Sequence, residues 1–299
     1  MEKYPADQQA FEQLINSEES CRSFLVHQRW PDGFYCPACG SSKAWYITTG
    51  RWECGECKRQ TSVTAGTLFQ DTRYPLRVWF QAIWYVAGQK YGVSALGLQR
   101  LLGLGSYHTA WAWLHRLRRA MVCPGRDHLS GTIQVDETFW GSEHTGKRGR
   151  GAGGKTIILV GIERKGSELG RVRLMPIPNA TGDTLITAIS TMVRPDSIIE
   201  TDGWSGYRGL TEKKFVHHVL KPESTEDLLP QVHLVVSLLK RWLMGTHQGG
   251  IQVSHLEYYL DEFTFRFNRR TSRSRGLLFR RILENAVQVT PLRGIDLRA

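Results

Sequence analysis

Apolar residues recur at helical spacing through the first part of the chain. The pattern predicts a short helical segment within 5–30, a helix after Pro75, and two more helices at 94–102 and 107–119. Gly103-Leu-Gly-Ser106 separates the last two, where the glycines permit a tight turn and Ser106 can cap the following helix. This is the pattern of a helix-turn-helix, although two ordinary packed helices would show the same spacing.

From residue 131 onward the pattern becomes strand-like. Runs rich in β-branched residues predict strands at 132–136, 156–163, 171–177, 197–202 and 215–220. Helical patterns occupy about 181–193, 231–244 and 254–268. Three consecutive strands with hairpin-type connections, then a helix and another strand, predict a mixed sheet with helices packed on it.

Composition narrows the class of protein. The chain has 299 residues, 41% of them hydrophobic, which is enough for about two domains. Its formal net charge of +11 favours a polyanionic partner, with a merely solvated basic surface as the alternative. No N-terminal apolar stretch of a signal peptide and no run of ~20 apolar residues occurs, so we expect a cytoplasmic protein without membrane contact.

Four cysteines form the strongest local motif. Cys36 and Cys39 are one CxxC pair, and Cys54 and Cys57 are a second pair after a hairpin-like segment. Two such knuckles supply the four thiolates of a tetrahedral zinc site. We therefore predict one structural zinc ion in a zinc ribbon, whose role could be DNA binding or simply stabilising a small module.

Two carboxylates end predicted strands. Asp136 closes the run that begins at Thr132, and Asp202 closes the run that begins at Ser197. Strand-end carboxylates in a strongly basic protein indicate metal-ion chemistry on a phosphodiester. Glu137 is excluded, because neighbouring side chains on a strand point to opposite faces.

The third ligand is sought on the helix predicted at 231–244. His233 and Lys240 lie seven residues apart and therefore on one helix face. A packed core histidine is the alternative, because the neighbours of His233 are apolar. Glu262 is the other possible third carboxylate, although a structural acid is the better interpretation of its surroundings. Neutral imidazole suits Mn²⁺ better than Mg²⁺.

Several basic residues are predicted to contact DNA. They are Arg116, Arg118 and Arg119 at the end of the second helix of the pair, Lys147, Arg148, Arg150 and Lys155 in a glycine-rich loop, and Arg269 and Arg270 in the basic run that extends to Arg281. The glycine-rich loop also matches the GxxxxGK[ST] phosphate-loop pattern. We reject ATP binding, because a strand and not a helix is predicted after Lys155.

These motifs together resemble the DDE-type transposases of bacterial insertion sequences, in the ISXO2-like group with an N-terminal zinc ribbon. The resemblance covers nearly the whole chain in order. It rests on the two CxxC pairs, Gly66-Thr-Leu-Phe-Gln-Asp-Thr-Arg-Tyr-Pro-Leu, Val135-Asp-Glu-Thr-Phe-Trp-Gly, Gly146-Lys-Arg-Gly-Arg-Gly, Thr201-Asp-Gly-Trp-Ser-Gly-Tyr, Ser237-Leu-Leu-Lys-Arg and Tyr259-Leu-Asp-Glu-Phe-Thr-Phe-Arg-Phe-Asn-Arg-Arg.

The resemblance implies an RNase H-like core that binds two Mg²⁺ or Mn²⁺ ions, cuts DNA at element ends and joins the freed 3′-OH to target DNA. Asp136 and Asp202 match the family's first two carboxylates, His233 its third ligand, and Lys240 its basic residue further along the same helix. This chain has Val235 and Val236 where relatives commonly show an aromatic pair. A homo-oligomer on double-stranded DNA, associated with the nucleoid, is also implied.

The predicted fold class is α+β and multidomain. The predicted segments are an N-terminal helical segment at 1–30, a zinc ribbon at 31–72, a helix-turn-helix region at 73–127, an RNase H-like mixed α/β catalytic core at 128–285 and a C-terminal tail at 286–299. A DNA-binding protein that lost catalysis, and a zinc-ribbon nuclease of repair or recombination, are the alternative functions.

Overall fold

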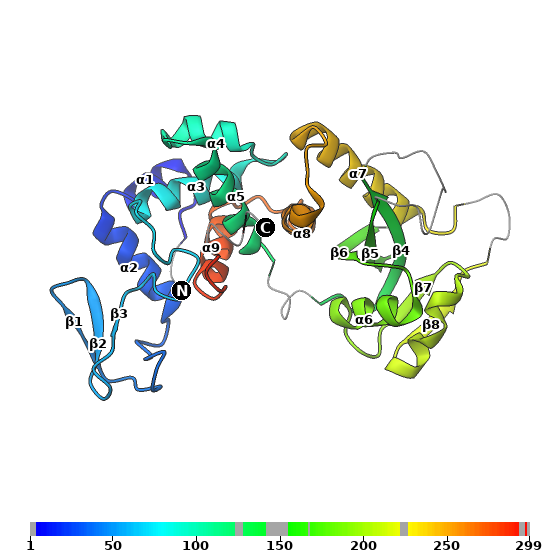
Figure 1. The fold of residues 1–299 in the computed structure, drawn as a ribbon, viewed down its shortest axis with the longest axis horizontal. Helices are drawn as coiled ribbons and strands as arrows, with labels where there is room; N and C mark the ends of the chain where they lie inside the picture. Colours follow the sequence, from blue (N-terminus) through cyan, green and yellow to red (C-terminus); the bar gives the residue numbers. More distant parts are fainter. Residues whose placement is uncertain are drawn as a thin grey trace. The chain divides into compact units, whose positions relative to one another are not determined.

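The computed structural model describes residues 4–122, 128–141, 155–166, 168–221, 227–292 and 297. The chain forms two compact units, shown in Figure 1. The first unit combines Met1–Met121 with Thr271–Ala299, and the second is Val122–Arg270. No helix in these described ranges is both long enough and apolar enough to cross a membrane.

The first unit is built from helices and a small sheet. Its helices are α1 (Gln8–Leu14), α2 (Glu18–Arg29), α3 (Leu76–Gly88), α4 (Ala95–Leu102), α5 (Tyr107–Arg119) and α9 (Arg275–Ala286). The predicted segment at 5–30 is two helices, because each has its own cap. The Asp7 side chain accepts a hydrogen bond from the Ala10 amide, and Ser17 forms a capping box with Ser20.

Helices α4 and α5 lie where the helix-turn-helix pattern predicted them. Gly103 ends α4 in the left-handed conformation, with φ of 62°, which favours glycine. The Ser106 side chain accepts a hydrogen bond of 3.1 Å from the Thr109 amide and so caps α5. Both local features were predicted from the sequence.

Helix α9 belongs to the core of the first unit. Phe279 is fully buried and lies within 6.2 Å, between ring centroids, of Phe11, Phe24, Phe80 and Trp84. The predicted catalytic segment extends to residue 285, whereas the compact second unit ends at Arg270. From the sequence, the residues around Arg280 are identified only as a basic run. In the structure they form the amphipathic helix α9, whose apolar side packs against α3.

The ribbon is a three-stranded antiparallel sheet of β1 (Ala44–Ile47), β2 (Arg51–Cys54) and β3 (Gln60–Thr61), in the order β1-β2-β3. The hairpin of β1 and β2 was predicted. It pairs Ala44 with Cys54, which fixes the second CxxC pair beside the first.

The second unit contains a five-stranded mixed sheet in the order β6-β5-β4-β7-β8. Its strands are β4 (Thr132–Trp140), β5 (Thr156–Lys165), β6 (Glu168–Ile177), β7 (Ile198–Thr201) and β8 (Val216–Val219). The pairs β4–β5 and β5–β6 are antiparallel, whereas β4–β7 and β7–β8 are parallel. A strand begins at Thr156, so the phosphate-loop match is a coincidence of sequence.

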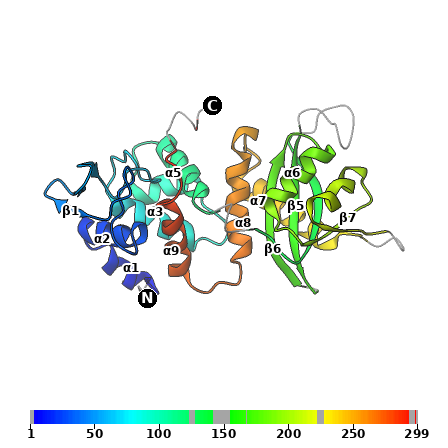
Figure 2. The ribbon, with the colours of Figure 1, turned by 90° about the horizontal axis from the view of Figure 1, so that it is seen from below.

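Helices cover both faces of this sheet, as Figures 1 and 2 show. One face of β5, with Ile158 and Val160, packs against α7 (Pro230–His247) and α8 (Leu256–Asn268). The other face of the sheet, with Ile133 of β4 and Leu159 of β5, packs against α6 (Gly182–Met192) and the short helix η1 (Ser205–Lys213). Alternation along each strand therefore assigns odd and even positions of β4 to opposite layers.

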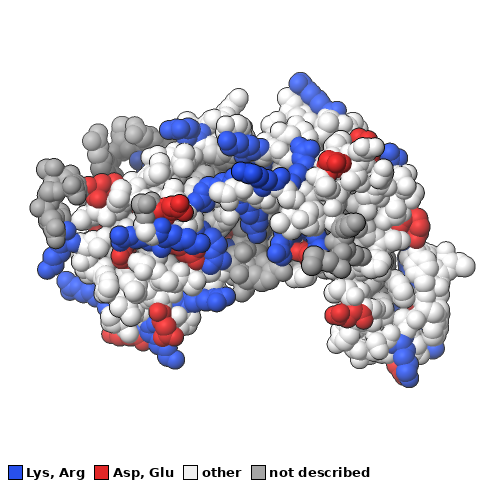
Figure 3. Space-filling view, turned by 180° about the vertical axis from the view of Figure 1, so that it is seen from behind, with Lys and Arg blue, Asp and Glu red and all other residues white. Residues whose placement is uncertain are grey.

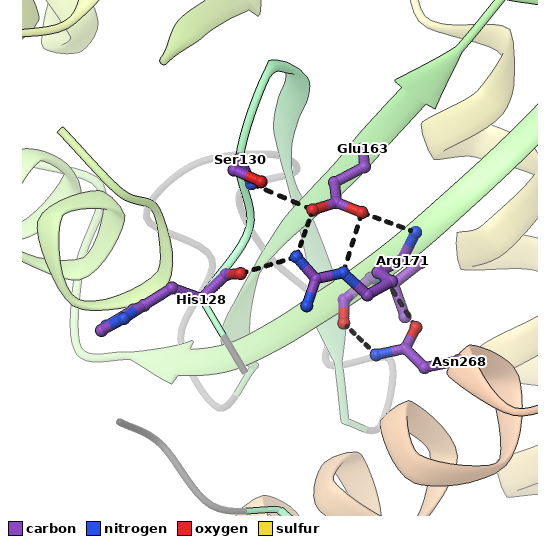
Figure 4. Close-up of polar contacts among 6 residues, drawn as sticks. His128, Ser130, Glu163, Arg171 and Asn268 are labelled. Atoms are coloured by element: carbon purple, nitrogen blue, oxygen red, sulfur yellow. Dashed lines mark hydrogen bonds and ion pairs between the residues drawn. The ribbon is translucent and has the colours of Figure 1, made fainter. Parts of the chain in front are cut away.

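An ion pair between the buried Glu163 and the half-buried Arg171 ties the chain before β4 to the sheet of the second unit (Figure 4). The Glu163 carboxylate accepts hydrogen bonds from Nη2 of Arg171 at 2.6 Å, from Nε of Arg171 at 2.9 Å and from the Ser130 amide at 3.0 Å. Arg171 also donates to the carbonyl of His128, and Asn268 on α8 bonds both backbone groups of Val172. One cluster thus joins β5, β6, α8 and the chain before β4.

Candidate metal centres and active site

The four predicted cysteines come together in the ribbon. Their sulfur atoms all lie within 4.8 Å of one another, with Sγ–Sγ distances of 3.7 Å for Cys36 and Cys57 and 3.5 Å for Cys39 and Cys54. A tetrahedral Zn²⁺ with ~2.3 Å bonds requires sulfurs about 3.8 Å apart. The zinc ribbon is confirmed, and its sulfur geometry fits one structural zinc ion.

Backbone hydrogen bonds favour the thiolate form of the first cysteine of each CxxC pair, since they lower the pKa of both Cys36 and Cys54. Hydrogen bonds from the amides of Ala38 and Cys39 lower the pKa of the Cys36 thiol to about 6. Zinc binds thiolate and not thiol. The turn that each CxxC pair forms therefore prepares its first cysteine for the metal.

The prediction that Asp136 ends its strand is wrong, because β4 continues to Trp140, whereas Asp202 directly follows the last residue of β7. Parallel pairing of the two strands still brings these aspartates side by side. In the β4–β7 ladder Gln134 lies opposite Glu200, and extension of this register by two residues puts Asp136 opposite Asp202. Both side chains then project to the same face, which is the face covered by α7. Adjacent parallel strands are about 4.8 Å apart.

Local hydrogen bonds orient each aspartate. Oδ1 of Asp136 accepts from the Glu137 amide at 2.8 Å, and Oδ1 of Asp202 accepts from the Trp204 amide at 3.1 Å. Burial raises the pKa of Asp136, and the charges of Glu137 and Asp202 raise it further. Crowded, partly buried carboxylates of this kind are stabilised by a bound cation.

Helix α7 brings His233 to the same place. Its Nε2 lies 3.4 Å from Oδ2 of Asp136, and its Nδ1 lies 2.7 Å from the carboxylate of Asp227. Burial lowers the pKa of His233, but the hydrogen bond and charge of Asp227, together with Asp136, more than offset this and the pKa is raised. The same hydrogen bond lowers the pKa of Asp227.

The structure separates the alternatives for His233. Its side chain is 53% exposed, so the alternative of a packed core histidine is wrong. Glu262 is 2% exposed and bonds Arg266 at 2.7 Å within α8, which makes it a structural acid. Lys240 is exposed on α7, seven residues after His233, and Pro230 occupies the first turn of that helix, where it is tolerated.

The aspartates and His233 are neighbours without forming a closed ligand cluster. Within the ranges that the structure describes, only the four cysteines bring three potential ligand atoms within 4.8 Å of one another. The side chains that hold a pair of metal ions ~4 Å apart lie farther from one another than the ligands of a single ion. The carboxylate oxygens fit hard divalent cations, and the imidazole fits Mn²⁺ better than Mg²⁺.

Two contacts of this site were not predicted. One is Asp227, which lies six residues before His233 outside any recognisable motif. The other is Tyr207, whose hydroxyl donates a 2.7 Å hydrogen bond to Oε1 of Glu137 on the opposite face of β4 from Asp136. Burial, and then the charge of Glu137, raises the pKa of Tyr207, so it remains a donor. Since Tyr207 ends the Thr201–Tyr207 motif, its position within that motif was the available signal.

The basic residues predicted to contact DNA have different environments. Arg118 is 2% exposed, and its burial argues against the predicted DNA contact. Arg116 is half-buried with Nε bonded to the Leu292 carbonyl, whereas Arg119 is exposed. Lys155 is half-buried directly before β5. Lys147, Arg148 and Arg150 lie outside the described residues.

The C-terminal pair of predicted DNA contacts also holds the second unit together. Arg269 lies over the ring of Phe265, and Arg270 lies over the ring of Phe267 and donates to the carbonyls of Leu169 and Gly170. On the face drawn in Figure 3, both units carry many other lysine and arginine side chains. Arg270 therefore has a structural role whatever its contact with DNA.

Comparison with known proteins agrees with this division of the chain. Residues 128–268 match the family model of the ISXO2-like transposase domain, and residues 16–60 match that of the transposase zinc-ribbon domain. A protein in the transposable element ISH50 of Halobacterium salinarum is 27% identical over 275 residues, 84% of this chain and 90% of that protein. A transposase-like protein of Haemophilus influenzae is 26% identical over 121 residues, 39% of this chain and 97% of that protein. Each matched domain falls inside one compact unit.

Proposed function

We propose that this chain, which belongs to the ISXO2-like transposases with an N-terminal zinc ribbon, cleaves the ends of a mobile DNA element and transfers the freed 3′-OH to target DNA. The observation that carries the proposal is the parallel register of β4 and β7. It aligns Asp136 with Asp202 beneath α7, and His233 of that helix contacts Asp136.

The proposed core is RNase H-like. Three antiparallel strands, β6, β5 and β4, continue into two parallel strands, β7 and β8, with helices on both faces. In this arrangement the parallel pair β4 and β7 lies in the middle of the sheet, and Asp202 follows the carboxyl end of β7, which is the kind of position where ligands of α/β proteins commonly bind. This supports a nuclease-type core in preference to a binding module.

Asp136 and Asp202 would hold two Mg²⁺ or Mn²⁺ ions, with His233 as the third ligand. When bound, such ions activate the attacking oxygen and stabilise the leaving oxygen of an in-line displacement at phosphorus. The backbone amides of Glu137 and Trp204 orient the two carboxylates. Asp227 would fix the tautomer and ring orientation of His233. Lys240 would contact a phosphate near the scissile bond.

DNA recognition is proposed for the first unit. From Ala110 to Arg118 the residues of α5 are buried or half-buried, so its exposed residues are Tyr107 and His108 in the first turn and Arg119 at the last position. The first residues of the second helix are the ones that read bases in a helix-turn-helix. We therefore move the proposed base contacts from the arginine-rich end of α5 to its N-terminal turn. A homo-oligomer on paired DNA ends is part of the same proposal.

Strand transfer with labelled element-end DNA tests the function. Wild type is compared with Asp202→Ala and His233→Ala in Mg²⁺ and in Mn²⁺. We expect Asp202→Ala to abolish transfer in both metals and His233→Ala to reduce it most in Mn²⁺. Tight DNA binding by wild type with no transfer in either metal would favour the alternative, a binding protein without catalysis.

A further inference from the structure

A pocket of about 630 Å³ opens in the first unit beside the zinc ribbon. Three pieces of chain form its wall: the end of α2 at Arg29, the edge strand β3 with the preceding Arg59, and the loop over 62–72. That loop contains most of the Gly66–Leu76 motif, which has no part in either metal centre. Pockets of this volume are typical of sites for small ligands and for parts of larger ones.

Arg29 is held so that part of its guanidinium faces the pocket. Its Nη1 donates two 2.8 Å hydrogen bonds, to the carbonyls of Ser62 and Val63. Its Nη2 points toward Gly66, where an added Cβ would lie 3.9 Å from that nitrogen. No carboxylate of the described chain lies within ion-pair distance of Arg29, and burial lowers its pKa, as expected for a desolvated cation without a counter-ion.

Thr61 also lines the pocket, and its hydroxyl is buried. The residue is 3% exposed, and its Oγ1 has no hydrogen-bond partner among the described residues. A buried hydroxyl without a partner is unfavourable, so its presence requires an explanation. Arg59, exposed next to it on the rim, adds a second guanidinium that pairs with no carboxylate of the described chain.

We propose that this pocket binds a phosphate group from the backbone of a DNA strand. Two guanidinium groups and a buried hydroxyl donor match the several acceptor oxygens of a phosphate, which guanidinium binds in bidentate fashion. The volume leaves room for the adjoining sugar. Binding of a phosphate by the pocket does not depend on the catalytic proposal. The identification of this phosphate as part of DNA rests on the proposed function.

One charge in the wall opposes an anion. Asp71 lines the pocket, and one of its carboxylate oxygens accepts a 3.2 Å hydrogen bond from Gln70. Asp71 has a positive φ of 55°, which asparagine also adopts readily. Asp71→Asn therefore removes the opposing charge without backbone strain, and we expect it to tighten phosphate binding.

Binding of a short labelled DNA duplex across a range of KCl concentrations tests the site in the full-length chain. Thr61→Val keeps the side-chain shape, and we expect it to weaken binding about tenfold because a hydrogen bond to an anion is lost. Arg59→Gln should make the negative slope of log K, the association constant for DNA, against log salt concentration shallower by about one. Arg51→Gln changes an exposed ribbon arginine outside the pocket and is the matched control. Zinc content verifies that each variant is folded.

Two further arms identify the source of the phosphate. Inorganic phosphate and deoxyadenosine monophosphate are added separately while the amide NMR signals of Thr61 and Gly66 are followed. Signal shifts that occur in wild type and are absent in Thr61→Val support the site. If the mononucleotide binds more tightly than the duplex, the bound phosphate comes from a nucleotide and not from DNA. Wild-type affinity of Thr61→Val for all three probes, in a folded protein, overturns the proposal. Strand transfer by wild type is measured separately, so a failed pocket and a failed transposase are distinguishable.

Discussion

The Glu163–Arg171 pair allows a quantitative test of how the second unit is held together. Glu163 is replaced by Gln, which keeps the side-chain volume and removes the charge. The wild-type carboxylate is 6% exposed and accepts hydrogen bonds from the Ser130 amide, the Arg171 amide and the Arg171 guanidinium. Loss of one partner from a buried pair costs about 3–5 kcal/mol. The Arg171 side chain is 39% exposed, so solvent screening reduces our expectation to about 2–4 kcal/mol.

The assay is thermal unfolding of the full-length chain by calorimetry, with hydrogen exchange to assign the loss to Val122–Arg270. For a unit of this size we expect the transition temperature to fall by roughly 4–16 °C. Glu212→Gln is the matched control, since Glu212 is exposed in the same unit. A Glu163→Gln variant as stable as this control would refute the assignment of the pair as a central contact.

The effect must also depend on pH in one direction. Burial alone would raise the pKa of Glu163, but the hydrogen bonds from Arg171 and Ser130 and the charge of Arg171 lower it below its ordinary value of 4.5. A depressed pKa contributes stability above the unfolded value, and this contribution is lost as pH falls through the folded value. The stability difference between wild type and Glu163→Gln should therefore be full at neutral pH and shrink below pH 4.5. A difference independent of pH would show that the charge is not its cause.

Three other changes have defined outcomes. Cys54→Ser should release zinc, measured by metal analysis, and weaken DNA binding while the second unit retains its thermal transition; unchanged zinc content would contradict the ligand assignment. Asp227→Asn should lower the pKa of His233, which is raised above 6.5 in wild type, because the charge and hydrogen bond of the acid favour imidazolium; an NMR titration with an unmoved midpoint would contradict this. Since this stabilisation is present below pH 6.5 and lost as pH rises through the raised value, the variant's stability deficit should be larger at pH 6 than at pH 8. Tyr207→Phe removes a buried hydrogen bond to Glu137 and should lower the free energy of unfolding, measured in urea, by about 1.5–3 kcal/mol. Tyr35→Phe, at an exposed tyrosine, is the control, and an equal loss in both variants would show that the bond is unimportant.

Local chemistry made the ribbon and the helix caps predictable. The spacing of the CxxC pairs specifies four ligands for one ion, and Ser106 caps α5 through a contact only three residues away. The existence of the strands was similarly predictable, because alternation and β-branched runs are properties of the strand itself, but their ends were not: β4 runs to Trp140 and not to Asp136. Asp136 and Asp202 could thus be singled out as candidate site residues from sequence alone, together with His233 by its helix position.

Tertiary structure decided what lies beside these residues. Only strand pairing sets the register that aligns Asp136 with Asp202, and only the packing of α7 brings His233 and Asp227 to them, because contacts between distant segments leave no periodic trace in the sequence. For the same reason, α9 was not predicted within the basic run around Arg280, and the burial of Arg118 was not predicted. Net charge favours a polyanionic partner, but exposure determines which cations could reach it, and exposure is a property of the folded chain.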